Sequence, residues 1–120
     1  GVRVTAETCP HYLTLTDEEY EEPDPTRCAC YVISPPLRSA ADRDALWVGL
    51  ADGSLDLVAT DHVPDRAGVE KAEAAKGISF DKISNGAPGI ETLSFTSKRK
   101  CFQSSLGRLV PVKGVMVALP

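Results

Sequence analysis

The run Leu55-Asp56-Leu57-Val58-Ala59-Thr60 constrains the fold of this chain more than any other stretch, because it is short, largely apolar and abruptly ended. Gly53 precedes it, and Pro64 stands a few residues after it. Such a run between turn residues predicts a buried β-strand over residues 55–60. Asp61 and His62 then follow the carboxyl end of the strand, which is where parallel α/β folds place their chemistry.

Asp61 has two interpretations that this stretch leaves open. An aspartate at the carboxyl end of a strand can bind a metal ion, act as a general base, or do both. It can equally cap the following turn, because aspartate is favoured in turns whatever the function. The polar groups that the fold brings beside Asp61 therefore decide its role.

The segment before this strand predicts a strand and then a helix. Residues 27–33 are rich in β-forming side chains and end at Ser34-Pro35-Pro36, which cannot continue a ladder. Ser39 is suited to cap a helix that runs through Leu50, with Gly53 just beyond its end. Strand, helix and strand with short connections form a βαβ unit, so we expect parallel pairing.

Weaker patterns complete the assignment. Alternating residues 2–6 predict the end of a further strand, which makes about three parallel strands in an α/β fold. Thr16-Asp17-Glu18-Glu19 matches a capping box and predicts a short helix to about Glu22. Residues 61–89 form a long polar stretch with a helical turn at 71–76, and long loops of this kind are usually functional or disordered. We also expect a helix near Ile90 and a strand at residues 114–119.

Composition excludes two classes of partner. The chain has 13 Lys and Arg against 17 Asp and Glu, a formal charge of −4, so it lacks the positive field that nucleic acid requires. No stretch approaches the roughly 18 apolar residues that span a bilayer. The four cysteines show no zinc spacing, and we expect free thiols in a cytoplasmic protein, with Cys28 and Cys30 on one face of a strand.

Polar side chains follow each of the three predicted strands. They lie at Glu7 to His11, at Ser34 to Arg38 and at Asp61-His62. Because the carboxyl ends of parallel strands share one rim of a sheet, we expect these groups to converge on a single pocket, as in a TIM-type barrel.

Five motifs occur in order along residues 1 to about 93. They are Glu7-Thr8-Cys9-Pro10-His11-Tyr12-Leu13, Ser34-Pro35-Pro36-Leu37-Arg38, Ala45-Leu46-Trp47, Thr60-Asp61-His62-Val63-Pro64 and Asn85-Gly86-Ala87-Pro88-Gly89-Ile90-Glu91. Together they resemble the C-terminal part of the catalytic barrel of the dihydropyrimidinase and D-hydantoinase family, within the cyclic amidohydrolases. We therefore expect residues 1–93 to be a barrel segment and residues 94–120 to be a divergent tail.

The resemblance implies a partial (β/α)8 barrel from a larger metal-dependent hydrolase. In the family, two metal ions, usually zinc, are bridged by a carbamylated lysine and by a hydroxide that attacks the ring amide of a hydantoin or dihydropyrimidine. Asp61 would then be a metal ligand and also the base that passes a proton to the leaving nitrogen. Ser34 and Asn85 would contact the substrate through their backbone atoms.

The resemblance covers only part of such an enzyme. The other metal ligands have no counterpart among the two histidines of the chain, so we expect His11 and His62 to support the site without binding metal. Three strands of eight do not make a barrel, so the chain alone should be inactive. The full-length relative is expected to form a homo-oligomer, a tetramer, and its partner is a small cyclic amide.

Two alternatives belong to other classes. One is a non-catalytic assembly or binding protein of the same fold, which would have no need of an acid at the position of Asp61. The other is a dihydroorotase or allantoinase. Ser34 before the two prolines, and the Asn85-Gly86 turn, favour the hydantoinase side.

Overall fold

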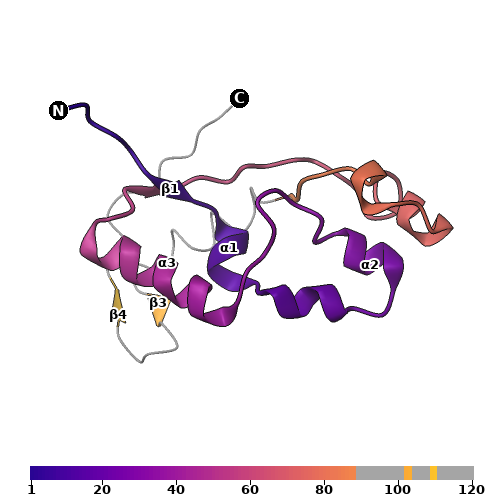
Figure 1. The fold of residues 1–120 in the computed structure, drawn as a ribbon, viewed down its shortest axis with the longest axis horizontal. Coiled ribbons are helices and arrows are strands. Elements are labelled where there is room, and N and C mark those ends of the chain that lie inside the picture. Colours follow the sequence, from indigo (N-terminus) through magenta and orange to yellow (C-terminus); the bar gives the residue numbers. More distant parts are fainter. Residues whose placement is uncertain (89–101, 104–108, 111–120) are drawn as a thin grey trace.

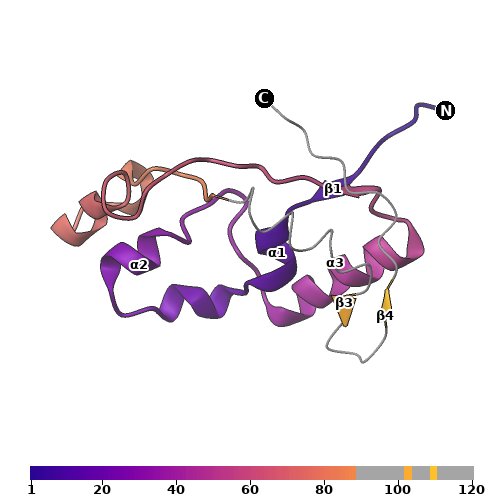
Figure 2. The ribbon, with the colours of Figure 1, turned by 180° about the vertical axis from the view of Figure 1, so that it is seen from behind.

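The structure is a computed structural model that describes residues 1–88, 102–103 and 109–110. In chain order its elements are β1 (Glu7–Thr8), α1 (Pro10–Thr14), the 3₁₀ helix η1 (Asp17–Glu21), α2 (Pro25–Ala29), α3 (Ala40–Asp52), β2 (Leu57–Val58), and the 3₁₀ helices η2 (Ala72–Lys76) and η3 (Phe80–Lys82). β3 (Phe102–Gln103) and β4 (Leu109–Val110) form an antiparallel pair. Figures 1 and 2 show β1 with α3 toward one end of the molecule, and α2 with the 3₁₀ turns toward the other.

The parallel pairing predicted from the sequence is present, between β1 and β2. Glu7 pairs with Leu57 and Thr8 with Val58. The strand predicted over residues 2–6 is wrong, because the ladder starts only at Ala6, whose carbonyl accepts from the Asp56 amide at 2.8 Å. The preceding amide, that of Leu55, instead donates to Gly49 at the end of α3, at 2.9 Å. The chain before Asp56 therefore turns back to the end of α3.

The predicted helix after Ser39 is confirmed as α3. Ser39 and Asp42 form a reciprocal capping box, in which the Asp42 amide lies 3.3 Å from Ser39 Oγ and the Ser39 amide lies 3.2 Å from Asp42 Oδ2. Gly53 ends the helix in the left-handed region at φ 84°, and its amide donates to Gly49 at 3.1 Å. A side chain at Gly53 would be strained there, which explains why the helix stops at this glycine.

Residues 27–33 are not a strand, which corrects the prediction. Their first part belongs to α2, which begins at Pro25 behind the Asp24 cap. The carboxylate oxygen Oδ1 of Asp24 accepts from the amides of Thr26 at 2.9 Å and Arg27 at 3.4 Å. This N-cap, with proline at the first helical position, outweighs the β-propensity that follows it. A third parallel strand is thus absent from residues 1–88, and Cys28 and Cys30 do not share a strand face.

Two short helices predicted from the sequence are of the 3₁₀ type. The helix predicted after Thr16 is the 3₁₀ helix η1, and the Thr16 side chain makes no capping hydrogen bond. The Asp17 amide, which begins η1, instead donates to the Arg38 carbonyl at 3.0 Å, so a tertiary contact replaces the capping box. The helical turn predicted at 71–76 is confirmed as η2, also of 3₁₀ type. The expected helix near Ile90, the strand at 114–119 and the boundary after residue 93 lie outside the described residues.

The core lies where α1, α3 and β2 meet. Leu13, Trp47 and Val58 are buried together, and Leu46 and Leu50 pack against them. The indole Nε1 of Trp47 donates to the Leu13 carbonyl at 2.9 Å. Helices α1 and α3 are thereby held beside β2, which positions the residues that follow β1 and β2. Within the described residues, no helix combines the length and the apolar character needed to cross a membrane.

Candidate active site

A cavity of about 260 Å³ brings together four of the residues predicted for the site. Its lining comprises His11, Ile33, Ser34, Asp61, Val63, Asn85, Gly86 and Ala87. The predicted convergence therefore occurs, although the segment before Ser34 is a helix followed by irregular chain and not a strand. His62 is exposed and does not line this cavity, and its backbone forms a parallel bridge with Ala87.

Asp61 lies just beyond β2 in an unusual backbone conformation. The chain leaves the strand at Val58, and Thr60 is still buried. Asp61 then adopts φ 44°, in the left-handed region that aspartate tolerates better than most residues do. This turn takes the chain out of the core and leaves the Asp61 carboxylate exposed at the cavity.

The negative charge of Asp61 raises the pKa of two residues that follow β1. Burial raises the pKa of the Cys9 thiol to about 11, and the charges of Asp61 and then Glu7 add to this effect. Burial likewise raises the pKa of Tyr12 to about 12, with smaller contributions from Cys9, Asp61 and Tyr20. The ends of β1 and β2 therefore share one electrostatic environment.

Burial favours the neutral form of the His11 imidazole, and one of its ring nitrogens has no hydrogen-bond partner among the described residues. Burial lowers the pKa of its imidazole below the usual 6.5, and the charge of Asp61 opposes this in part. Its Nε2 atom is buried and has no hydrogen-bond partner among the described residues. The ring stands edge-on to Tyr12, with 4.2 Å between the ring centroids. A neutral imidazole at the cavity wall can accept or donate one hydrogen bond.

Ser34 and Asn85 also line the cavity. The Asn85 Nδ2 atom donates to Ser34 Oγ at 2.7 Å, and both side chains are exposed. Beside them, the Gly86 amide donates to the Val32 carbonyl at 3.0 Å. Gly86 adopts φ 140°, and a Cβ atom there would collide with the Val63 side chain. Only glycine therefore suits this close approach of the two segments.

Lys71 is a residue of this region that sequence reasoning missed. The sequence predicts only a helical turn there, and a lysine among alanines and glutamates is normally solvent-exposed. In the structure its side chain is 2% exposed. No local signal reveals this, because the two carbonyls that accept from its ammonium lie 13 and 39 positions away in the sequence.

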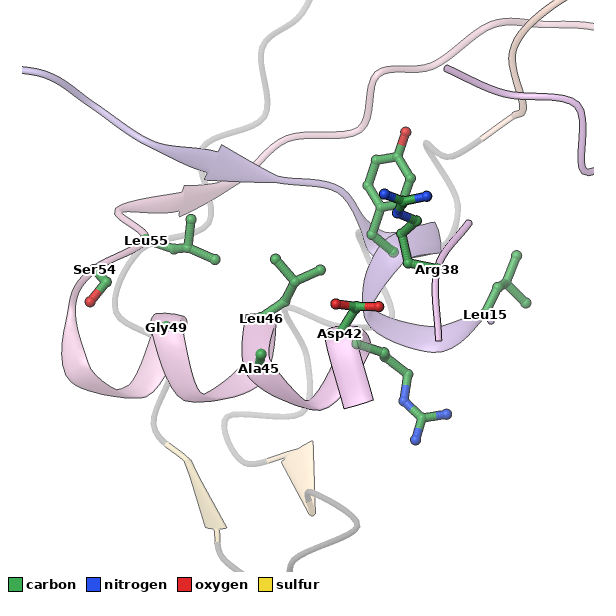
Figure 3. Close-up of a pocket in the computed structure, with 10 residues that line it drawn as sticks. Leu15, Arg38, Asp42, Ala45, Leu46, Gly49, Ser54 and Leu55 are labelled. Carbon is green, nitrogen blue, oxygen red and sulfur yellow. The ribbon is translucent and has the colours of Figure 1, made fainter. Parts of the chain in front are cut away.

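Two further cavities lie nearby. One of about 430 Å³ shares Ile33, Ser34 and Asn85 with the first and is mostly apolar. The other, of about 450 Å³, lies between α1, α3 and the chain before β2, and Figure 3 shows Leu46 and Leu55 beside it. Although it is larger, it contains no residue predicted for catalysis or substrate binding. The small cavity at Asp61 is therefore the candidate site.

The described residues at the cavity provide an incomplete set of ligands for a metal ion. Among the described residues, no three His, Cys, Asp or Glu side chains are grouped so that they could hold one. Catalytic zinc takes three protein ligands and leaves one position open. The exposed Asp61 carboxylate fits as one ligand. The others would have to come from outside the described part of the chain.

Comparisons with known proteins identify similar enzymes, although no protein-family model matches the chain. It is 37% identical over 118 residues to D-phenylhydantoinase of Escherichia coli O1:K1, which covers 96% of this chain and 24% of that enzyme. It is 50% identical over 92 residues to dihydroorotase of Bacillus caldolyticus, covering 77% of this chain and 19% of that enzyme.

A solved structure supports the same relationship. The crystal structure of dihydropyrimidinase from Brevibacillus agri NCHU1002 aligns with a TM-score of 0.67 and 43% identity, over 73% of this chain and 18% of that one. The chain thus spans about a quarter or less of the length of the proteins it matches.

Proposed function

This chain belongs, as one segment, to the cyclic amidohydrolase family that includes dihydropyrimidinase, D-hydantoinase and dihydroorotase, and from that premise we propose that it is part of a hydrolase that opens a cyclic amide. The observation that carries the proposal is the cavity that Asp61 lines together with Ser34, Asn85 and His11. Our proposed substrates are hydantoins or dihydropyrimidines, whose ring amides offer both a carbonyl carbon and a leaving nitrogen.

The complete fold we propose is a (β/α)8 barrel. The parallel pair β1 and β2 supports it, because parallel strands need a covered crossover connection and place functional residues at their carboxyl ends. Cys9, Pro10 and His11 follow β1 directly, and Asp61 follows β2 by three residues. Two strands of such a barrel would thus each contribute a side of the cavity.

In the proposed reaction Asp61 moves a proton. Water oxygen forms a bond to the ring carbonyl carbon, the carbon–nitrogen bond breaks, and the Asp61 carboxylate takes the proton from the water and delivers it to the departing nitrogen. A divalent metal ion, when bound with Asp61 as one ligand, would lower the pKa of that water. Because Asp61 is exposed at the cavity, its carboxylate is accessible to both partners in the transfer.

Ser34 and Asn85 would hold the ring. The main chains of Ser34 and Asn85 carry amides and carbonyls that match the alternating carbonyl and N–H groups of an imide. His11 would support Asp61, because both residues line the cavity and the charge of Asp61 acts on the His11 imidazole. His62 would support the site from outside the cavity, through the parallel β-bridge that its backbone forms with Ala87.

A segment exchange tests this function. Residues 1–120 replace the homologous segment of the Escherichia coli D-phenylhydantoinase, and ring opening of hydantoin, dihydrouracil and dihydroorotate is measured with added zinc. We expect activity with the first two rings and a loss of about 100-fold or more in kcat for Asp61→Asn. Asp17→Asn, an exposed aspartate on η1, is the matched control. An Asp61→Asn hybrid as active as its parent would refute the assignment.

A further inference from the structure

Lys71 is buried beneath the wall of the candidate site. Its side chain is 2% exposed, which is rare for lysine because removing an ammonium from water is costly unless it is paired. The Nζ atom donates to the Val32 carbonyl at 3.4 Å and, over a shorter distance, to the Ser84 carbonyl. It also lies 3.4 Å from Asp65 Oδ2, and the Asp65 side chain is 10% exposed.

The two carbonyl partners of Lys71 belong to segments that are far apart in the chain. Val32 is 39 positions from Lys71 and Ser84 is 13 positions from it. Val32 lies two residues before Ser34, and Ser84 directly precedes Asn85. One ammonium group therefore bonds to both of the main-chain segments that present Ser34 and Asn85.

Two other contacts also join these segments. The Asn85 to Ser34 side-chain hydrogen bond lies in contact with solvent, where water competes for both groups. The Gly86 amide bonds to the same Val32 carbonyl that Lys71 contacts. Among these contacts Lys71 supplies the charged, buried donor, and a charge-assisted hydrogen bond such as the one to the Ser84 carbonyl is about twice as strong as a neutral one.

We propose that Lys71 is a positioning residue of the candidate site, whose ammonium fixes the spacing between the Ser34 and Asn85 main chains. The inference rests on the proposed function only where it concerns substrate binding. The Asp65 carboxylate balances the charge of the ammonium as an ion pair at 3.4 Å, although its Oδ2 atom forms no hydrogen bond among the described residues. Lys71 does not line the cavity, so it acts through the two segments and touches no substrate.

Amide hydrogen exchange on the full 120-residue chain, measured by NMR, tests the geometry. The Gly86 amide reports on the link to Val32, and the Ala59 amide, bonded to Thr8 at 2.9 Å, reports on the β1–β2 pair. We expect Lys71→Met to speed exchange at Gly86 by about tenfold or more and to leave Ala59 within about twofold. Lys71→Arg keeps a cation and should exchange more slowly at Gly86 than Lys71→Met does.

Lys76→Met is the matched control, because Lys76 lies on the same 3₁₀ turn but is exposed and paired with Glu73. It should leave both amides unchanged. If the Lys71→Met variant does not fold, Asp65→Asn takes its place, since this change removes the ion pair and keeps the two carbonyl contacts. The Gly86 amide should again exchange faster than in the parent chain. Unchanged exchange at Gly86, or equal acceleration at Gly86 and Ala59, would overturn the proposal.

The hybrid enzyme described above provides the substrate measurement. We expect Lys71→Met to raise KM by about tenfold and to lower kcat less, because the reacting groups remain in place while the ring is held less well. An unchanged KM beside faster exchange at Gly86 would overturn the positioning role. An inactive parent hybrid would count against the proposed function instead, and the exchange measurement would still decide the role of Lys71 in the spacing.

Discussion

The Asn85 side chain donates a hydrogen bond of 2.7 Å to the Ser34 hydroxyl, although 51 positions separate the two residues. Both residues line the cavity at Asp61 and also the apolar cavity of about 430 Å³ beside it. The pair therefore forms part of the partition between the two spaces.

A double-mutant cycle on Ser34→Ala and Asn85→Ala tests whether this hydrogen bond stabilises the fold. Because both side chains are exposed, we expect a coupling free energy of only about 0.5 kcal/mol, the low end for a neutral hydrogen bond. Urea unfolding followed by circular dichroism measures it. Strictly additive effects of the two substitutions would show that the hydrogen bond contributes nothing.

Gly86→Ala should be clearly destabilising. The added Cβ atom would collide with Val63, and the backbone at φ 140° is strained for any residue with a side chain. We expect a loss of about 1–3 kcal/mol in the free energy of unfolding. Gly68→Ala is the control, because no atom lies within 4 Å of a Cβ built there. Equal stability of the two variants would contradict the close approach of Gly86 to Val63.

The imidazole of His11 should titrate below 6.5 in the metal-free chain. Burial favours its neutral form, so the folded state binds this proton less readily than the unfolded state does. The contribution of His11 to stability is thus complete above pH 6.5 and declines as the pH falls from there through the lower folded pKa. Proton NMR of the imidazole resonances measures the titration.

Asp61→Asn gives the sharper version of this test. The charge of Asp61 raises the pKa of His11, so its removal should lower that pKa further. Asp17→Asn should leave it unchanged. A His11 pKa that rises in Asp61→Asn would contradict the proximity of the two groups.

Cys9 should react slowly with iodoacetamide. Its pKa of about 11 leaves only about one thiol in a thousand ionised at pH 8, and the side chain is buried. Cys28 and Cys30 are partly exposed and should be alkylated first, which peptide mass spectrometry can resolve. Because Asp61 contributes to the raised pKa of Cys9, Asp61→Asn should speed the alkylation of Cys9. Faster labelling of Cys9 than of Cys28 in the parent chain would contradict this account.

The isolated 120-residue chain should not open hydantoin rings, with or without added zinc. The described residues supply Asp61 alone as an accessible acid at the cavity, whereas a catalytic zinc needs three protein ligands. A colorimetric assay of the ring-opened product measures turnover. Measurable hydrolysis by this chain, abolished by a chelator, would show that it assembles a metal site by itself.

Local sequence signals predicted α3 well. Its start depends on Ser39 and Asp42 and its end on Gly53, all within hydrogen-bonding reach along the chain. The same kind of local signal stands at Asp24-Pro25, where an N-cap and a proline begin α2 just before residues whose β-propensity predicted a strand. The three predicted strand ends nevertheless indicated His11, Ser34 and Asp61 as neighbours, and these residues line one cavity together with Asn85, which the family resemblance had indicated.

The sequence by itself determined the α3 helix and the turn at Asp61 after an apolar run, because each depends on groups close together in the chain. The tertiary structure alone decided where the β1 ladder begins, since its partner lies near residue 56. It also decided the burial of Lys71, whose partner carbonyls are 13 and 39 positions away. A lysine is expected in water until the fold brings such distant acceptors and a carboxylate around its ammonium.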